Sequence, residues 1–216
     1  MHIDFYFDFI SPYAYFAFRR IESIAAEAGA SLTLHPVLFA GLLNHWGQLG
    51  PAEIPPKKEF TARDIARYAV VHDFELRGPA AHPFNPLIAL RAALAAGDER
   101  AKACRAIFDA GWGRGIDLGD ETQIAAALNE AGLDGAGLVA ATADPAVKKE
   151  LHRTTAAAIA RGVFGVPTML VGDALFWGND QLDYLRSHLA GQDPLDRVSG
   201  GLPLGRREGA QRRSKP

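Results

Sequence analysis

With 216 residues, nearly half of them apolar, the chain can bury a full core as one α/β domain with an insertion or as two small domains. Its net charge of -2 gives no reason to expect nucleic acid or an anionic membrane as a partner, and no apolar run is long enough to span a bilayer. The one cysteine, Cys104, excludes an internal disulfide, and the start of the chain has no secretory pattern, so we expect a cytoplasmic protein.

The first part of the chain predicts a βαβ unit. Residues 3–9 are aromatic and β-branched, as in a buried strand. Ser11-Pro12 is typical of a helix N-cap followed by proline at the first helical position, and the helical pattern stops at Gly29. Residues 31–36 alternate as a second strand does, which completes the unit.

The middle of the chain is predicted to be mostly helical. Residues 39–54 contain several glycines and prolines, and we expect a loop there. An alanine-rich helical pattern then continues for about a hundred residues. The helices expected within it cover residues 57–74, 86–96, 99–113, 121–130, 136–143 and 145–161.

Strands return near the end of the chain. Residues 168–171 and 175–177 predict two short strands around a Gly172-Asp173 turn, and a final helix is expected over residues 180–189. This order of elements predicts an α/β protein, a thioredoxin fold with a large all-helical insertion. We expect a thioredoxin-like domain of residues 1–38 and 163–191, a helical insertion of residues 39–162, and a disordered basic tail of residues 192–216.

Ser11 stands where a thiol-redox protein of this fold carries its reactive cysteine. A helix N-terminus has about half a positive charge and free N–H groups, so a bound thiolate would be stabilised by the helix and by the Ser11 hydroxyl. The alternative is that Ser11 only caps its helix. We expect a site that has lost its own thiol and uses the thiol of bound glutathione.

Two later segments would complete this site. In Gly165-Val166-Pro167-Thr168 we expect a cis proline that faces the first helix, with the Val166 backbone paired to an extended peptide such as glutathione; an ordinary trans turn is the alternative. In Trp177-Gly178-Asn179-Asp180 the N–H groups would hold the γ-glutamyl carboxylate and Asp180 its ammonium group, although these residues are also common in helix caps. Lys57 would meet the glycyl carboxylate, unless it is only a solvated charge.

Other reactive residues give weaker signals. Cys104 lies in an alanine-rich helical segment and is better explained as a small core residue than as a nucleophile. The seven histidines have no metal-like spacing, so we expect no metal. The sequence has no phosphate loop, dinucleotide fingerprint or nucleophile elbow.

Three motifs together make the chain resemble a known family: residues 4–13 (DFYFDFISPY), 163–169 (VFGVPTM) and 177–182 (WGNDQL). Over roughly residues 3–190 the chain is similar to the 2-hydroxychromene-2-carboxylate isomerases. These are glutathione-dependent enzymes related to kappa-class glutathione transferases and to the DsbA group. The chain departs from the family at Gln48, in a stretch that often has asparagine, and at Gln181, where arginine is usual.

The resemblance implies roles for the site residues. Ser11 would be the catalytic residue that faces the glutathione sulfur, and the other glutathione contacts would be Lys57, Val166, Trp177, Gly178, Asn179 and Asp180. The second substrate, a small aromatic compound, would lie against the segments that differ from the family, at Asn44, His45, Gln48, Phe84 and Asn85. We also expect a homodimer.

The expected function is a glutathione-dependent isomerase of a conjugated aromatic carboxylate, of the 2-hydroxychromene-2-carboxylate to trans-o-hydroxybenzylidenepyruvate type, acting by reversible thiolate addition. A kappa-like glutathione transferase would use the same thiolate but release a conjugate. A thioredoxin-like module would bind glutathione without turnover. A disulfide oxidoreductase is disfavoured because Ser11 and Ala14 stand where it needs cysteines.

Overall fold

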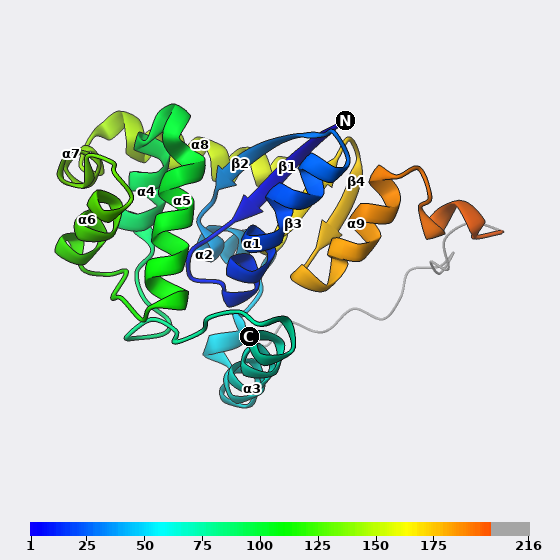
Figure 1. The fold of residues 1–216 in the computed structure, drawn as a ribbon, viewed down its shortest axis with the longest axis horizontal. Coiled ribbons are helices and arrows are strands. Elements are labelled where there is room, and N and C mark those ends of the chain that lie inside the picture. Colours follow the sequence, from blue (N-terminus) through cyan, green and yellow to red (C-terminus); the bar gives the residue numbers. More distant parts are fainter. Residues whose placement is uncertain (200–216) are drawn as a thin grey trace.

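The fold is built on a four-stranded mixed sheet, in a computed structural model that describes residues 1–199 (Figure 1). In spatial order the strands are β2 (Ser31–Pro36), β1 (His2–Phe7), β3 (Thr168–Val171) and β4 (Ala174–Trp177). β1 is parallel to β2 and antiparallel to β3, and β3 is antiparallel to β4. The predicted α/β thioredoxin fold with a helical insertion is confirmed.

The helices follow the predicted pattern closely, except for one. They are α1 (Pro12–Glu27), α2 (Phe39–Trp46), α3 (Pro55–His72), α4 (Leu87–Ala95), α5 (Arg100–Phe108), α6 (Glu121–Glu130), α7 (Gly135–Ala141), α8 (Pro145–Ala160) and α9 (Leu182–Leu189). A π-helical turn, Asp109–Gly113, extends α5, and a 3-10 turn, Asn179–Gln181, precedes α9. In Figure 1, α4 to α7 lie beside the sheet beyond β2, and α3 stands at the lower edge of the molecule.

The prediction of a loop over residues 39–54 is wrong in its first half, which forms α2. The N-terminus of this helix is held by side chains that are distant in sequence: Thr155 Oγ1 accepts from the Leu38 N–H at 3.0 Å, and Asp8 Oδ2 accepts from the Phe39 N–H at 2.9 Å. Leu42, within α2, is fully buried. Packing and these hydrogen bonds from distant residues therefore stabilise a helix that the local sequence does not predict.

The two faces of the sheet have separate cores. Ile3, Phe5 and Phe7 alternate along β1 and face the large core that includes α1, α4, α5 and α9. Tyr6 points to the other face, where a smaller cluster forms with residues of α2, α8 and the segment before β3. Because full burial of a phenylalanine contributes about 1.5–3 kcal/mol, this alternation fixes which face of β1 meets α1.

One aromatic cluster joins the insertion to the sheet. The ring of Phe108, at the end of α5, lies 5.5 Å from Phe7, 4.6 Å from Phe9 and 5.1 Å from Phe18. These rings are fully buried or nearly so. The hydrophobic core therefore continues across the boundaries at residues 38 and 163 that we predict between the two domains, and that division stays a prediction.

The end of the described chain contains a short element. Residues Pro194–Arg197 form a 3-10 turn, and the His188 ring nitrogen Nδ1 lies 2.8 Å from Asp193 Oδ2. The rest of the predicted disordered tail, residues 200–216, lies outside the described residues. Within residues 1–199, no helix combines the length and the apolar character that crossing a membrane requires.

Candidate active site

Ser11 is positioned by the sharp turn between β1 and α1. Its backbone is extended (φ -94°, ψ 117°), Pro12 opens the helix, and the Ser11 Oγ accepts from the Ala14 N–H at 3.2 Å. The same hydroxyl lies 3.5 Å from the Val166 carbonyl oxygen, at the weak limit of a hydrogen bond. Ser11 thus caps α1 as predicted, and its hydroxyl proton has only this one weak acceptor among residues 1–199.

The loop before β3 faces this hydroxyl. The Val166-Pro167 peptide is cis, which confirms the prediction. The Val166 N–H has no hydrogen-bond partner among residues 1–199, and its carbonyl accepts only the weak contact from Ser11. Val166 therefore presents both backbone groups as the edge of a strand does, which is the arrangement that pairs with an extended peptide.

The segment Trp177–Asp180 forms a second wall. Trp177 is 51% exposed and packs over Gly165, where an added Cβ would lie 2.5 Å from the indole Nε1. Gly178 has a φ of 109°, which turns the chain into the 3-10 turn. The Asn179 side chain is nearly buried, yet its amide bonds to none of residues 1–199. An amide without a partner in the described chain is able to bond to water or to a ligand, and the binding role of Asn179 stays a prediction.

Tyr13 connects α3 to the start of α1. Its hydroxyl donates to Asp64 Oδ2 at 2.8 Å. Burial raises the pKa of Tyr13 above its usual range, and the hydrogen bond to Asp64 and the nearby charge of Asp180 add to this. Asp180 itself is exposed. Tyr13 remains a protonated phenol at neutral pH.

Side chains from the insertion hold the turn that presents Ser11. The His82 Nε2–H donates to the Ile10 carbonyl at 2.9 Å, and the Trp112 Nε1–H donates to the Phe9 carbonyl at 2.7 Å. Burial lowers the pKa of His82, and the charge of Lys58 lowers it further, although the bond to Ile10 acts in the opposite direction. Because a carbonyl only accepts, the neutral ring carries its proton on Nε2 and keeps a lone pair on Nδ1. No motif in the sequence predicts this contact.

Asp8 was also missed as a site residue. Its side chain is fully buried, Oδ1 accepts from the Ile10 N–H at 3.1 Å, and Oδ2 accepts from the Phe39 N–H. Its carbonyl accepts from the Ser11 N–H at 3.1 Å. Burial raises the pKa of Asp8 to about 7, while the backbone hydrogen bonds lower it. An acid within an otherwise aromatic strand was the available signal. Asp8 joins the Ser11 turn to α2.

The residues expected to bind the second substrate are spread over two segments. Asn44, His45 and Gln48 are exposed at the end of α2, and the neighbouring Trp46 Nε1–H donates to the Val163 carbonyl at 3.0 Å, so this end of α2 lies against the segment that leads to Pro167. Their binding role stays a prediction.

On the other segment, Phe84 is partly buried against the core, with its ring 6.5 Å from that of His82. Asn85 Oδ1 accepts from the N–H of Leu87, the first residue of α4, at 3.1 Å. Lys57 is exposed in the first turn of α3, and the structure gives it no side-chain partner among residues 1–199. The ligand roles of all three residues stay predictions.

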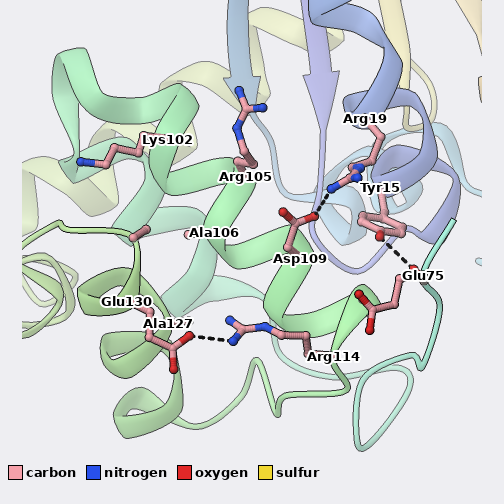
Figure 2. Close-up of a pocket in the computed structure, with 12 residues that line it drawn as sticks. Tyr15, Arg19, Glu75, Lys102, Arg105, Ala106, Asp109, Arg114, Ala127 and Glu130 are labelled. Atoms are coloured by element: carbon pink, nitrogen blue, oxygen red, sulfur yellow. Dashed lines mark hydrogen bonds and ion pairs between the residues drawn. The ribbon is translucent and has the colours of Figure 1, made fainter.

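A cavity of about 440 Å³ lies apart from Ser11, between α1 and the helices α5 and α6 (Figure 2). Figure 2 shows Arg19 paired with Asp109 (2.9 Å) and Arg114 paired with Glu130 (2.6 Å). The Tyr15 hydroxyl donates to the Glu75 carbonyl at 2.9 Å. Since these polar groups already bind one another, we assign the cavity no role in the site.

Known proteins are similar to this chain over nearly all of its described residues. The model of the DSBA-like thioredoxin domain matches residues 2–190. The chain is 35% identical over 190 residues to a 2-hydroxychromene-2-carboxylate isomerase of Sphingobium xenophagum, covering 87% of this chain and 97% of that protein. Human glutathione S-transferase kappa 1 is 27% identical over 210 residues, covering 88% and 91% of the two chains. A solved structure of 2-hydroxychromene-2-carboxylate isomerase is similar with a TM-score of 0.81 at 30% identity, covering 88% and 95%.

Proposed function

Since the chain belongs to the family of DSBA-like thioredoxin domains, and within it to the 2-hydroxychromene-2-carboxylate isomerases, we propose that it is a glutathione-dependent isomerase of a conjugated aromatic carboxylate. The observation that carries the proposal is a hydroxyl, in place of a thiol, at the start of α1 beside the cis-Pro167 loop. Because position 11 is a serine, a thiol at the start of α1 has to be supplied by a bound ligand. Glutathione is named in the kappa transferases that the chain resembles.

The residues around Ser11 fit a tripeptide thiol. Val166 offers an N–H without a partner in residues 1–199 and a carbonyl, and both can pair with the backbone of the ligand. The Asn179 amide, which bonds to no residue of the described chain, and the exposed carboxylate of Asp180 suit the two charged groups of a γ-glutamyl end. The positive end of α1 favours a thiolate next to Ser11.

Glutathione, when bound, would supply a thiolate that adds to a conjugated carbon of the substrate and later leaves, so that the former double bond can rotate in between. The Ser11 hydroxyl would donate a hydrogen bond to the sulfur in place of its weak contact with the Val166 carbonyl. A hydrogen bond to a charged group contributes about 1.5–3 kcal/mol, which corresponds to a thiol pKa lower by about one to two units. Ser11 would thereby keep the sulfur ionised at neutral pH.

A kappa-like transferase is the second candidate, because the chain is 27% identical to the human kappa 1 enzyme. Both activities need the same thiolate. They differ in outcome, since an isomerase returns free glutathione and a transferase consumes it into a stable conjugate. Mass spectrometry of the products, at known amounts of glutathione and substrate, separates the two.

Removal of glutathione tests the proposal directly. The protein would be passed through gel filtration to remove small thiols, and conversion of 2-hydroxychromene-2-carboxylate would be followed with and without added glutathione. We expect conversion only with glutathione. S-methylglutathione, which keeps the peptide groups but has no ionisable thiol, should inhibit and not support turnover. Undiminished conversion without thiol would rule out the glutathione mechanism.

Ser11→Ala tests the role of the hydroxyl. The pKa of the bound thiol should rise by about one to two units, as measured by the ultraviolet absorbance of the thiolate during a pH titration. Glutathione affinity should fall less than turnover, because the contacts through Val166 and Asn179 remain. The lost helix cap costs about 0.5–2 kcal/mol of stability. Ser23→Ala, in the same helix, is the control. Equal titration curves in both variants would show that Ser11 acts only as a helix cap.

A further inference from the structure

A second cavity, of about 290 Å³, lies on the face of the sheet that points away from α1. It is enclosed by β1, β2 and α8. Tyr6, Thr33 and His35 line it from the strands, Glu150 and Thr154 from α8, and Arg100 from the first turn of α5. None of these residues belongs to the candidate active site. The cavity thus brings a group of polar side chains together where the proposed reaction does not use them.

Arg100 is the unusual member of this group. Its side chain is half-buried, and among residues 1–199 its one hydrogen bond is a long one, of 3.3 Å from Nη1 to the Leu34 carbonyl. Nε is buried with no hydrogen-bond partner, and the guanidinium forms no ion pair among residues 1–199. A buried guanidinium N–H without a hydrogen-bond partner is costly, and native proteins rarely leave one unexplained.

The acidic side chain that lines this cavity is already paired. Glu150 lines the same cavity but forms two hydrogen bonds with Arg153, at 2.8 and 2.6 Å. Those bonds lower the pKa of Glu150, and the charge of Arg100 contributes only as a smaller, longer-range effect. With two arginines and one glutamate, the lining has a net charge of +1 when His35 is neutral. The excess charge is that of Arg100.

The open side of the guanidinium suits an oxyanion. Nε and Nη2 lie on one edge of the planar group and donate in parallel, while Nη1 is turned to Leu34. Nε is buried and Nη2 is not, so an anion in the cavity would reach the guanidinium first at Nη2. Thr33 and Tyr6 add hydroxyl groups to the same space.

We propose that this cavity is a binding site for a small oxyanion, held by the free edge of Arg100. The volume is just below the roughly 300–1,000 Å³ of sites for drug-sized ligands, so the occupant has few atoms, as inorganic phosphate, sulfate or a short carboxylate does. Because Arg100 also contacts β2 through Leu34, and His35 is bonded to Asp4 of β1 at 2.7 Å, a bound anion stabilises this edge of the sheet. The site is independent of the glutathione site.

Thermal unfolding of the full-length protein tests the proposal. Phosphate, sulfate and acetate would each be titrated at constant ionic strength, with chloride as the balancing salt. We expect at least one oxyanion to raise Tm in a saturable manner, by about 3–6 °C at ten times its Kd. A response to phosphate and sulfate alone would identify a tetrahedral anion, and a response to acetate a carboxylate. Arg100→Gln should abolish the rise, and Arg114→Gln, which removes an arginine paired with Glu130, should keep it.

A measurement on the unaltered protein covers the case in which Arg100→Gln does not fold. The ring signals of His35 would be followed by nuclear magnetic resonance during the same titrations, with those of the exposed His45 as an internal reference. Saturable movement of the His35 signals alone would support the site. No oxyanion effect beyond that of chloride on Tm and on His35, or an equal Tm rise in Arg100→Gln, would overturn the proposal.

Discussion

Asp8→Asn should remove a pH dependence of stability that a buried carboxyl group imposes. Asp8 is completely inaccessible to solvent and accepts hydrogen bonds only from backbone N–H groups among residues 1–199. Burial raises its pKa from 3.8 to about 7, although the hydrogen bonds from Phe39 and Ile10 act in the other direction. The carboxyl group therefore holds its proton more tightly in the folded state than in the unfolded chain.

The sign and size of the effect follow from proton linkage. Between pH 3.8 and about 7 the folded protein binds the Asp8 proton and the unfolded chain does not, so stability falls as pH rises. The contribution is complete below the unfolded pKa and is lost above the folded one. A shift of about three units corresponds to about 4 kcal/mol, of which about 2.5 kcal/mol is lost between pH 5 and pH 8.

Urea unfolding of the wild type and of Asp8→Asn at several pH values from 5 to 8 measures this loss. At pH 5 the variant should be less stable by about 1–3 kcal/mol, since its amide can place an N–H group against a backbone donor. By pH 8 the difference should have moved by about 2.5 kcal/mol in favour of the variant, because only the wild type carries the buried charge. Other titrating groups cancel in the difference.

Asp120→Asn is the matched control. Hydrogen bonds from Gln123 and Thr122 lower the pKa of Asp120, so it is ionised in both states throughout this range, and the variant should differ from the wild type by the same amount at every pH. If the free energies of Asp8→Asn and the wild type run parallel from pH 5 to pH 8, the carboxyl group of Asp8 is not desolvated as described and the reasoning is refuted.

Two further predictions concern residues outside the site. Cys104→Ser should keep most activity, because burial raises the pKa of this thiol and leaves it unreactive, and urea unfolding should show a loss of about 1–3 kcal/mol for the buried hydroxyl; loss of turnover with an intact fold would contradict this. Deletion of all residues after Gln192 should leave turnover intact and lower Tm only slightly through loss of the Asp193–His188 contact. A large drop in Tm or activity would mean that the tail docks on the protein.

Local sequence signals explain which helices were predictable. α1 begins at a serine-proline pair and is followed by Gly29 with a φ of 59°, so both of its ends can be recognised from adjacent residues. The start of α2 has no such local signal. Its first N–H groups are bonded to Thr155 and Asp8, which are brought there by the tertiary fold. A pattern read over ten or fifteen residues does not contain that information.

The residues of the candidate site also fall into those that short sequence motifs predict and those that only the tertiary fold brings together. Ser11, Val166 and the Trp177–Asp180 segment stand in motifs whose chemistry can be inferred from short stretches of sequence. The contact of His82 with the Ile10 carbonyl and that of Trp112 with the Phe9 carbonyl cannot be inferred in this way, because they depend on how the insertion folds back over the turn. Asp8 is intermediate, since an acid in an aromatic strand is visible in the sequence but its partners are not.

The position of Phe108 has a consequence for engineering and for evolution. Its ring fills the space between Phe7, Phe9 and Phe18. Deletion of the helical insertion would therefore leave a cavity in the aromatic core and expose the apolar faces of these rings to water. The insertion cannot be removed without loss of stability in the rest of the fold. Chimeras that exchange it between related proteins should fold only when the aromatic side chains on both sides of the junction are transplanted as a set.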